Sequence, residues 1–279
     1  MSGRLRVVIV TSNASGNAAR VTEHILHAVP EVEVVGAIVD RGTRSDRSRQ
    51  RKRLAAWWRH GGPAYVATRL WSMVLPKLDG RRGTRYHVGL EDLAVRAGFE
   101  LIEVPNVNSP EAATALERLH ADLGVSIGNR IIKERIFTIP RLGMINLHHG
   151  AIPDYRGGPP GFWELHDDAR EMGISVHRID AMLDHGDLLA AATVPVLAED
   201  DTRTLVERAR QVDHQIVAEA LRSLARGESR SIDVDLAGSR PRTLPSRADV
   251  RRASRRRGRR IDPRGYIDAA LPAVYPEER

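Results

Sequence analysis

Residues 5–11, LRVVIVT, form a run dominated by apolar, β-branched side chains close to the start of the chain. A strand with one solvated face alternates apolar and polar residues, so a continuous run indicates a strand buried on both faces, as in a parallel sheet. A polar loop, a helix over 18–28 and a second strand over 33–40 are predicted to follow. This order of elements predicts an α/β, doubly wound sheet with ligands at the carboxyl ends of its strands.

The same alternation resumes near residue 90. Helices are predicted over 90–97 and 110–120, and strands over 100–104, 123–127, 144–148, 174–180 and 188–196. One long amphipathic helix is predicted over 202–224, behind a polar cap at Asp201 or Thr202. Its apolar stripe consists of Leu205, Ala209, Val212, Ile216, Ala220 and Leu224. A mostly parallel sheet flanked by helices therefore accounts for most of residues 1–225.

Two segments depart from this pattern, and both are basic. Residues 41–86 carry 13 Lys or Arg against 2 acids, a net charge of +11, and residues 226–279 carry 14 against 8, a net charge of +6. Since the whole chain carries +7, the remaining residues are acidic, with a net charge of −10. The sequence predicts one α/β domain over 1–225 with a basic helical insertion at 41–86, followed by a short basic tail over 226–279.

The insertion also holds three of the four tryptophans, Trp57, Trp58 and Trp71. Its apolar side chains recur at helical intervals around a Gly-Gly-Pro break, which predicts two short amphipathic helices. We expect the insertion to pack onto the body of the protein. A lid over a site, a contact in a homodimer, and a membrane-surface or nucleic-acid contact are alternatives, because basic and aromatic side chains suit all of them.

Cysteine is absent from the sequence, which excludes disulfides, thiolate metal sites and a cysteine nucleophile. The apolar runs are short and no signal-peptide pattern opens the chain, so we expect a cytoplasmic protein without a transmembrane segment.

Polar side chains that suit catalysis are concentrated between residues 145 and 187. In the strand over 144–148, Ile145 and Leu147 point to one face, whereas Asn146 and His148 share the other. A loop rich in Gly and Pro follows, and a tight turn after the next strand carries Asp184. An amide, an imidazole and a carboxylate at strand ends suit proton transfer and the stabilisation of an oxyanion.

The order and spacing of these residues resemble those of the folate-dependent formyltransferases. That family carries Asn-x-His at a strand end, then a Pro-x-Tyr/Phe-Arg/Lys-Gly loop and, after the next strand, Asp-x-Gly-Asp/Gln. The matching residues of this chain are Asn146 and His148, then Pro153, Tyr155, Arg156 and Gly157, then Asp184, Gly186 and Asp187. A weaker resemblance extends from Leu5 to about Ala225, with an interruption after Val39. The resemblance implies a Rossmann-like catalytic domain.

It also implies a formyltransferase that moves a formyl group from 10-formyltetrahydrofolate to the amine of a small molecule, with an amino sugar or a phosphate-bearing amine as leading candidates. Asn146 and His148 would stabilise the oxyanion formed when the amine attacks, with His148 acting as an imidazolium. Asp184 would orient His148 and help to carry the proton. The alternatives are a methionyl-tRNA formyltransferase-like enzyme, a formyltetrahydrofolate hydrolase, and a non-catalytic nucleic-acid-binding protein of the same fold.

The resemblance divides the remaining site residues between two halves. Residues that would hold the folate are Arg130, Ile131, Ile132, Leu183 and Asp187. Residues on the acceptor side would be Ser12, Asn13, Ser15, Gly16, Asn17, Gly150, Tyr155 and Arg156. The loop over 12–17 precedes a helix, where backbone amides suit a phosphate, although an ordinary turn and helix cap have the same composition.

Some residues of this chain depart from the family or stay outside its pattern. His149 and Gly150 follow the catalytic histidine where Pro-Ser is common, and His185 enters the Asp-x-Gly turn. No metal is expected, because adjacent strand residues such as His148 and His149 point to opposite faces. His166 and His177 are interpreted as incidental.

The tail carries seven arginines between Arg251 and Arg260. Arginine runs bind RNA through its phosphates. The tail is nevertheless too short for the domain that follows the catalytic domain in tRNA formyltransferases. A nucleic-acid partner is therefore an alternative that we do not favour, and we expect removal of the chain after Arg226 to leave formyl transfer largely intact.

Overall fold

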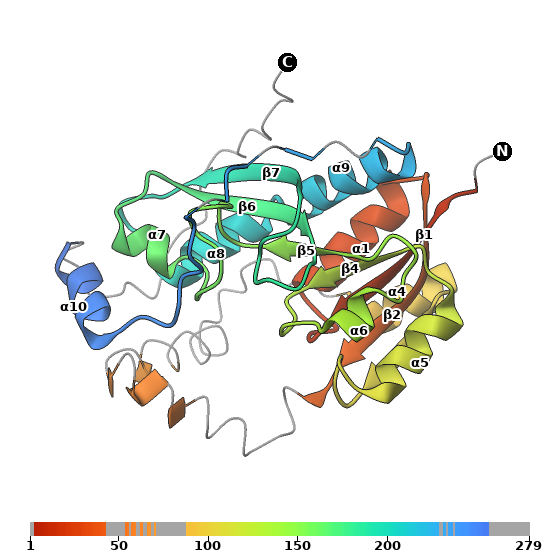
Figure 1. Cartoon of the computed structure of the whole chain (residues 1–279), viewed down its shortest axis with the longest axis horizontal. Coiled ribbons are helices and arrows are strands. Elements are labelled where there is room, and N and C mark those ends of the chain that lie inside the picture. Colours follow the sequence, from red (N-terminus) through yellow and green to blue (C-terminus); the bar gives the residue numbers. More distant parts are fainter. Residues whose placement is uncertain are drawn as a thin grey trace.

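A seven-stranded sheet runs through the part of the chain that the computed structural model describes, which comprises residues 3–42, 54–55, 57–59, 62–63, 66–67, 70, 88–228, 231–232, 234–236 and 238–256. The strand order is β3-β2-β1-β4-β5-β6-β7 (Figure 1). The strands are β1 (Leu5–Thr11), β2 (Val32–Asp40), β3 (Glu100–Val104), β4 (Leu123–Ile127), β5 (Met144–His148), β6 (Glu171–Arg178) and β7 (Leu188–Pro195).

The first five strands are parallel, whereas β6 is antiparallel to β5 and β7 is antiparallel to β6. From β1 the chain extends the sheet to β2 and β3 on one side, and then to β4 and β5 on the other. The carboxyl ends of β1 and β4 therefore flank the point at which the strand order reverses, where ligands bind in folds of this kind. The predicted mostly parallel, doubly wound α/β sheet is confirmed.

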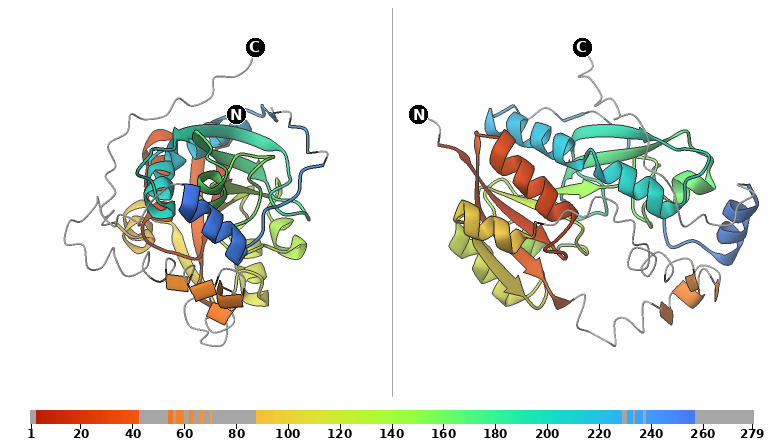
Figure 2. Two further views of the ribbon diagram at one scale, coloured as in Figure 1. Left: turned by 90° about the vertical axis from the view of Figure 1, so that its left-hand side faces the viewer. Right: turned by 180° about the vertical axis from the view of Figure 1, so that it is seen from behind.

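Helices cover both faces of the sheet (Figure 2). One face is packed by α1 (Asn17–Ala28), α4 (Leu90–Ala97), α8 (Thr202–Arg210) and α9 (Asp213–Ala225), and the other by α5 (Pro110–Leu119) and α6 (Glu134–Phe137). Along β1, Val7 and Ile9 belong to the first core and Val8 and Val10 to the second, and all four side chains are fully buried. Since β1 has no solvated face, its sequence does not alternate.

The single helix predicted over 202–224 is two helices. The chain tightens after α8, where the amides of Gln211 and Val212 donate to the carbonyls three residues earlier, those of Arg208 and Ala209. The apolar stripe continues across the break between the two helices because Val212 is itself fully buried. The spacing of apolar residues therefore did not indicate the break. As a result α9 begins at Asp213.

The described part of the insertion packs onto the body, as expected. The Trp57 side chain is buried in a small cluster with Phe162 and Trp163 of α7 (Phe162–His166), whereas Trp58 is exposed. Helix α10 (Arg247–Arg256) packs on α7 at the same end of the molecule (Figure 1). The third tryptophan, Trp71, and the end of the arginine run, residues 257–260, lie outside the described residues.

The segment before α10 lies along the loop that follows β5. The Arg242 amide donates to the Arg156 carbonyl at 2.6 Å, and Gly157 and Arg242 form an isolated parallel bridge. The Trp163 indole N–H donates to the Thr243 carbonyl at 3.0 Å. The C-terminal segment therefore buttresses this loop, which argues against the expectation that it is dispensable.

Among the described residues, no helix has both the length and the apolar character needed to cross a membrane.

Candidate active site

A pocket of about 890 Å³ opens at the carboxyl edge of the sheet. Thr11 of β1, Ile127 of β4 and His148 of β5 line it at the ends of their strands. This is the place that the doubly wound topology favours for a ligand. Asn146 and Asp184 line the same pocket, so the structure brings the three predicted catalytic residues together.

His148 has a contact at each of its two ring nitrogens. Its Nε2 lies 2.9 Å from the Tyr155 carbonyl oxygen, which only accepts hydrogen bonds, so Nε2 carries a proton and donates it. The Nδ1 atom lies 3.4 Å from Oδ2 of Asp184. In the neutral imidazole Nδ1 is therefore the nitrogen with a free lone pair, and it faces a carboxylate.

The loop after β5 fixes the turn that carries Asp184. The Gly157 amide donates to Oδ2 of Asp184 at 2.9 Å, and the Arg156 guanidinium donates to the Leu183 carbonyl at 2.9 and 3.2 Å. Gly186 allows the turn to close on the end of β6, because a Cβ there would collide with the Arg178 carbonyl. Arg156, predicted on the acceptor side, is 3% exposed and does not line the pocket. In this structure it braces the catalytic turn.

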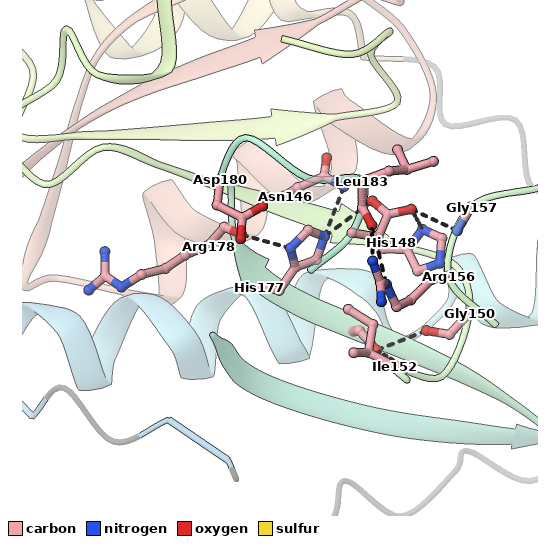
Figure 3. Close-up of polar contacts among 12 residues, drawn as sticks. Asn146, His148, Gly150, Ile152, Arg156, Gly157, His177, Arg178, Asp180 and Leu183 are labelled. Carbon is pink, nitrogen blue, oxygen red and sulfur yellow. Dashed lines mark hydrogen bonds and ion pairs between the residues drawn. The ribbon is translucent and has the colours of Figure 1, made fainter. Parts of the chain in front are cut away.

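His177 belongs to the site, and its interpretation as incidental was wrong. It pairs with Asn146 across the β5–β6 ladder. Its Nδ1 donates to the Arg178 carbonyl at 2.8 Å, so its Nε2 accepts from the Asn146 amide at 3.3 Å (Figure 3). The same Nε2 lies 3.5 Å from Oδ1 of Asp184. Only the register of the antiparallel pair indicates this contact, and the spacing of residues along the chain does not give that register.

The Asp184 carboxylate lies between two imidazoles. Burial by itself raises its pKa, but the contact with His177, the charge of His148 and the Gly157 amide together lower the pKa to about 2. Burial lowers the pKa of His148, and the nearby Asp184 and the Tyr155 carbonyl offset this only in part. At neutral pH the free site therefore holds an ionised Asp184 and a neutral His148. Protonation of His148 would add an N–H at Nδ1, directed at Asp184.

The predicted folate half is largely assembled at one end of the pocket. Arg130, Ile131, Ile132 and Leu183 all line it. The Arg130 side chain is tied to the buried Asp40 at the end of β2, with 2.9 Å between Nε and Oδ2. Asp187 does not line the pocket, and its carbonyl accepts from the Arg178 amide at 2.9 Å, which joins the ends of β6 and β7.

The predicted acceptor half is assembled in part. Asn13, Ser15 and Asn17 line the pocket beside the first turn of α1. Predicted residues that do not line it are Ser12, Gly16, Gly150 and Tyr155. Gly150 nevertheless shapes the site, because a Cβ there would crowd Nε2 of His148 and the Tyr155 carbonyl.

His149 also lines the pocket and contacts Asp213, and neither residue was predicted to belong to the site. The Nε2 atom of His149 lies 2.9 and 3.0 Å from the two oxygens of Asp213, which also accepts from the Asn17 amide at 2.6 Å. His149 and His148 line one pocket although they are adjacent in sequence, because the chain leaves β5 between them. Among the described residues, no group of three or more metal-binding side chains is placed to hold an ion.

Comparison with known proteins agrees with this geometry. A family model described as "Formyl transferase" matches residues 74–221. The methionyl-tRNA formyltransferase of Citrifermentans bemidjiense is 34% identical over 137 residues, which cover 49% of this chain and 43% of that protein. The chain thus spans about half the length of the curated relatives it matches.

Solved structures share the fold at lower identity. Glycinamide ribonucleotide transformylase 1 from Symbiobacterium toebii matches with a TM-score of 0.58 and 21% identity, covering 86% of this chain and 94% of that one. The N-formyltransferase from Helicobacter canadensis, solved with folinic acid and dTDP-3-aminofucose, matches with a TM-score of 0.55 and 17% identity, covering 86% and 71%. The family match spans more than half of the sequence and includes all of β5, β6 and the turn of Asp184, and the chain therefore belongs to the formyl transferase family.

Proposed function

We propose that this protein transfers a formyl group from 10-formyltetrahydrofolate to the amine of a small molecule. The observation that carries the proposal is the convergence of Asn146, His148 and Asp184 on one pocket, with 3.4 Å between Nδ1 of His148 and the Asp184 carboxylate. A neutral imidazole beside an anionic carboxylate is suited to take and return a proton. The family to which the chain belongs supports the same chemistry.

The residues in the pocket fit a folate. The volume of about 890 Å³ falls in the range of roughly 300–1,000 Å³ that is usual for cofactor-sized ligands. Two apolar side chains at the pocket are uncovered, since Ile131 is 71% exposed and Leu183 is 40% exposed. These side chains, with Ile132 and Arg130, would hold the flat ring system of the folate. The bound folate supplies a formyl carbon that is open to attack by an amine.

The side chains around that position have separate tasks. The Asn146 amide carries two N–H groups, and its contact with His177 uses one of them. The second is free to donate to an oxygen that gains negative charge during the transfer. His148 takes a proton at Nδ1, where the resulting imidazolium is stabilised by Asp184. His177 accepts from the amide and lies beside the carboxylate.

For the acceptor we propose a small amine, with an amino sugar or a phosphate-bearing amine as leading candidates. The pocket continues from His148 toward Asn13, Ser15 and Asn17 at the start of α1, where polar groups and a helix N-terminus suit a polar or anionic acceptor. The sequence relatives are methionyl-tRNA formyltransferases, which makes aminoacyl-tRNA the second candidate. A cytoplasmic location and a homodimer remain predictions.

An acceptor screen tests the proposal. The full chain is incubated with 10-formyltetrahydrofolate and a panel of nucleotide-linked amino sugars, amino acids, phosphorylated amines and aminoacyl-tRNA. Mass spectrometry follows the formylated product, and absorbance follows the release of tetrahydrofolate. We expect one class of small amine to be formylated, and His148→Ala to abolish that product. Release of formate without any formylated amine would indicate a hydrolase, and an inert donor would contradict the proposal.

A further inference from the structure

The pocket contains a second imidazole–carboxylate pair, which the chemistry above does not use. His149 follows β5 and Asp213 is the first residue of α9. The His149 Nε2 lies 2.9 and 3.0 Å from the two Asp213 oxygens. The His149 side chain is 14% exposed and the Asp213 side chain 0%. The carboxylate is thus shielded from solvent behind a ring that lines the pocket.

Asp213 fixes which nitrogen of His149 is available to a ligand. A carboxylate only accepts hydrogen bonds, and Asp213 already accepts from the Asn17 amide at 2.6 Å. The His149 Nε2 must therefore carry a proton and donate it to Asp213, so in the neutral ring Nδ1 is the nitrogen with the lone pair. Among the described residues, none forms a hydrogen bond with Nδ1 of His149. The break between α8 and α9 makes this arrangement possible, because it places Asp213 at a helix N-terminus, where a negative charge is favoured.

His149 lies on the side of the pocket that we propose for the amine acceptor. His149 and Asn17 both line the pocket and both contact Asp213, so His149 lies beside the first turn of α1. Three ionisable groups act on the His149 ring: Asp213 from α9, the buried Glu164 from α7, and His148 from β5. An amine bound on the proposed acceptor side, beside the first turn of α1, would therefore lie next to His149.

The proton balance of the proposed reaction requires more than one acceptor. An alkylamine at neutral pH is an ammonium ion, and its nitrogen loses two protons when it becomes a formamide. The C–N bond from the formyl carbon to the folate nitrogen breaks as the C–N bond to the amine forms, and one proton goes to that folate nitrogen. The other proton leaves to solvent. His148 and Asp184 are placed to carry one of the two, and the other must leave the ammonium before its nitrogen can attack.

We propose that His149, oriented by Asp213, accepts this first proton from the ammonium group of the acceptor at Nδ1. The inference rests on the proposed formyl transfer and assigns a residue to a separate step of it. Acceptor deprotonation at His149 precedes attack, and His148 then serves the transfer itself. Asp213 is a positioning residue, since it acts only through the ring.

Two probe acceptors separate this role from a structural one. 2-Aminoethanol is protonated at neutral pH, whereas hydroxylamine is not. The variant His149→Gln keeps an N–H that can reach Asp213 but offers no basic nitrogen. At pH 7 we expect kcat/KM for 2-aminoethanol to fall about 100-fold in His149→Gln, the scale of general-base catalysis, while the value for hydroxylamine stays close to wild type. The loss for 2-aminoethanol should shrink as the pH rises and the amine deprotonates without help.

Controls define the outcomes. His148→Gln should impair both acceptors, and His24→Gln, on α1 beside His214, should impair neither. Equal losses for both acceptors in His149→Gln, or no loss for 2-aminoethanol, would overturn the inference. If the wild type formylates neither amine, neither probe belongs to its acceptor class, and the acceptor screen tests the proposed function independently. Nitrogen NMR of the free protein with ¹⁵N-labelled histidine then tests the role of His149 directly. We expect its Nδ1 to be unprotonated and the Nδ1 resonance to shift when 2-aminoethanol is added. A protonated or unresponsive Nδ1 would refute the role.

Discussion

At the scale of single residues, the site places one carboxylate between two imidazoles and a backbone amide. Asp184 receives the Gly157 amide and faces the imidazoles of His148 and His177. Its charge is stabilised by these partners more than it is destabilised by burial, because its pKa is lowered to about 2. At neutral pH Asp184 is therefore ionised, and the lowered pKa of His148 leaves that ring neutral.

Replacement of this charge by an isosteric neutral group tests its part in catalysis. We expect Asp184→Asn to lower kcat by about 100-fold or more, because the amide cannot stabilise an imidazolium at His148. The fold should persist, since Asn retains an oxygen for the Gly157 amide. Asp154→Asn, at an exposed position of the preceding loop, is the matched control and should leave kcat unchanged. Near-normal turnover of a folded Asp184→Asn protein would contradict the assignment.

In a second carboxyl group, that of Glu164, the effect of burial outweighs the favourable contacts and raises the pKa. Glu164 on α7 is 2% exposed, and burial raises its pKa to about 7. Its folded-state pKa is thus above the value in the unfolded chain. It therefore favours folding below its unfolded pKa of 4.5, and this contribution is lost as the pH rises through about 7.

Neutralising Glu164 should consequently stabilise the protein, by an amount that grows as the pH rises from 4.5 to about 7 and is nearly constant above that. We expect Glu164→Gln to raise the free energy of unfolding by about 2 kcal/mol at pH 8, and to change it little at pH 4.5, where the wild-type side chain is protonated in the folded state. Urea unfolding of both proteins at the two pH values measures the difference. A gain of the same size at both pH values would show that charge is not the cause.

At the scale of elements, the sequence predicted what depends on local pattern. The strands at β1, β2 and β5 were predicted because their side chains are buried in a regular order, and the Asn-x-His and Asp-x-Gly motifs brought Asn146, His148 and Asp184 to one pocket. The role of His177 depends on the register of two antiparallel strands, and that of Asp213 on the break between two helices. Both are set by packing between residues far apart in the chain, which no local pattern encodes.

The two ends of the pocket should respond differently to substitution. Ile131 is highly exposed in the segment after β4, so Ile131→Asp should not disturb folding. It should weaken binding of a non-reactive folate analogue at least tenfold, because a charge replaces apolar surface against the ring system. Asn13→Ala, at the α1 end, should leave that affinity unchanged. Calorimetry measures the dissociation constant of the analogue for both variants. If Asn13→Ala weakens binding and Ile131→Asp does not, the folate and acceptor sides are the reverse of those proposed.

At the scale of the whole molecule, the C-terminal segment is part of the site's support. The Arg156 guanidinium, which braces the Asp184 turn, also lies within hydrogen-bonding distance of Ser239, at 3.4 and 3.5 Å. The Ser239 hydroxyl donates to the Pro153 carbonyl at 2.7 Å, and Arg242 pairs with Asp167 at 2.8 Å. Residues 239–243 thus join the loop after β5 to the chain beyond α7.

Two truncated forms separate the contribution of residues 239–243 from that of the residues after Arg256. A chain that stops after Arg226 loses Ser239, Arg242 and α10, and we expect both lower thermal stability and a large loss of formyl transfer. A chain that stops after Arg256 keeps every described contact, and we expect it to retain transfer to a small amine. Loss of activity in the longer truncated form, together with formylation of aminoacyl-tRNA by the full chain, would favour the tRNA alternative. Melting temperature and turnover of the two forms measure the outcome.

The contacts between residues 239–243 and the loop after β5 have a consequence for synthesis on the ribosome. The sheet and its covering helices are complete once Ala225 has emerged, so the nascent chain can bury its core early. The partners of Arg156 and Trp163 come from Ser239 and Thr243, and these are among the last described residues to be translated. A ribosome that stalls between these points holds a folded domain whose catalytic loop lacks its buttress. Premature stop codons in this short interval should therefore yield soluble but inactive protein, unlike stop codons within the sheet.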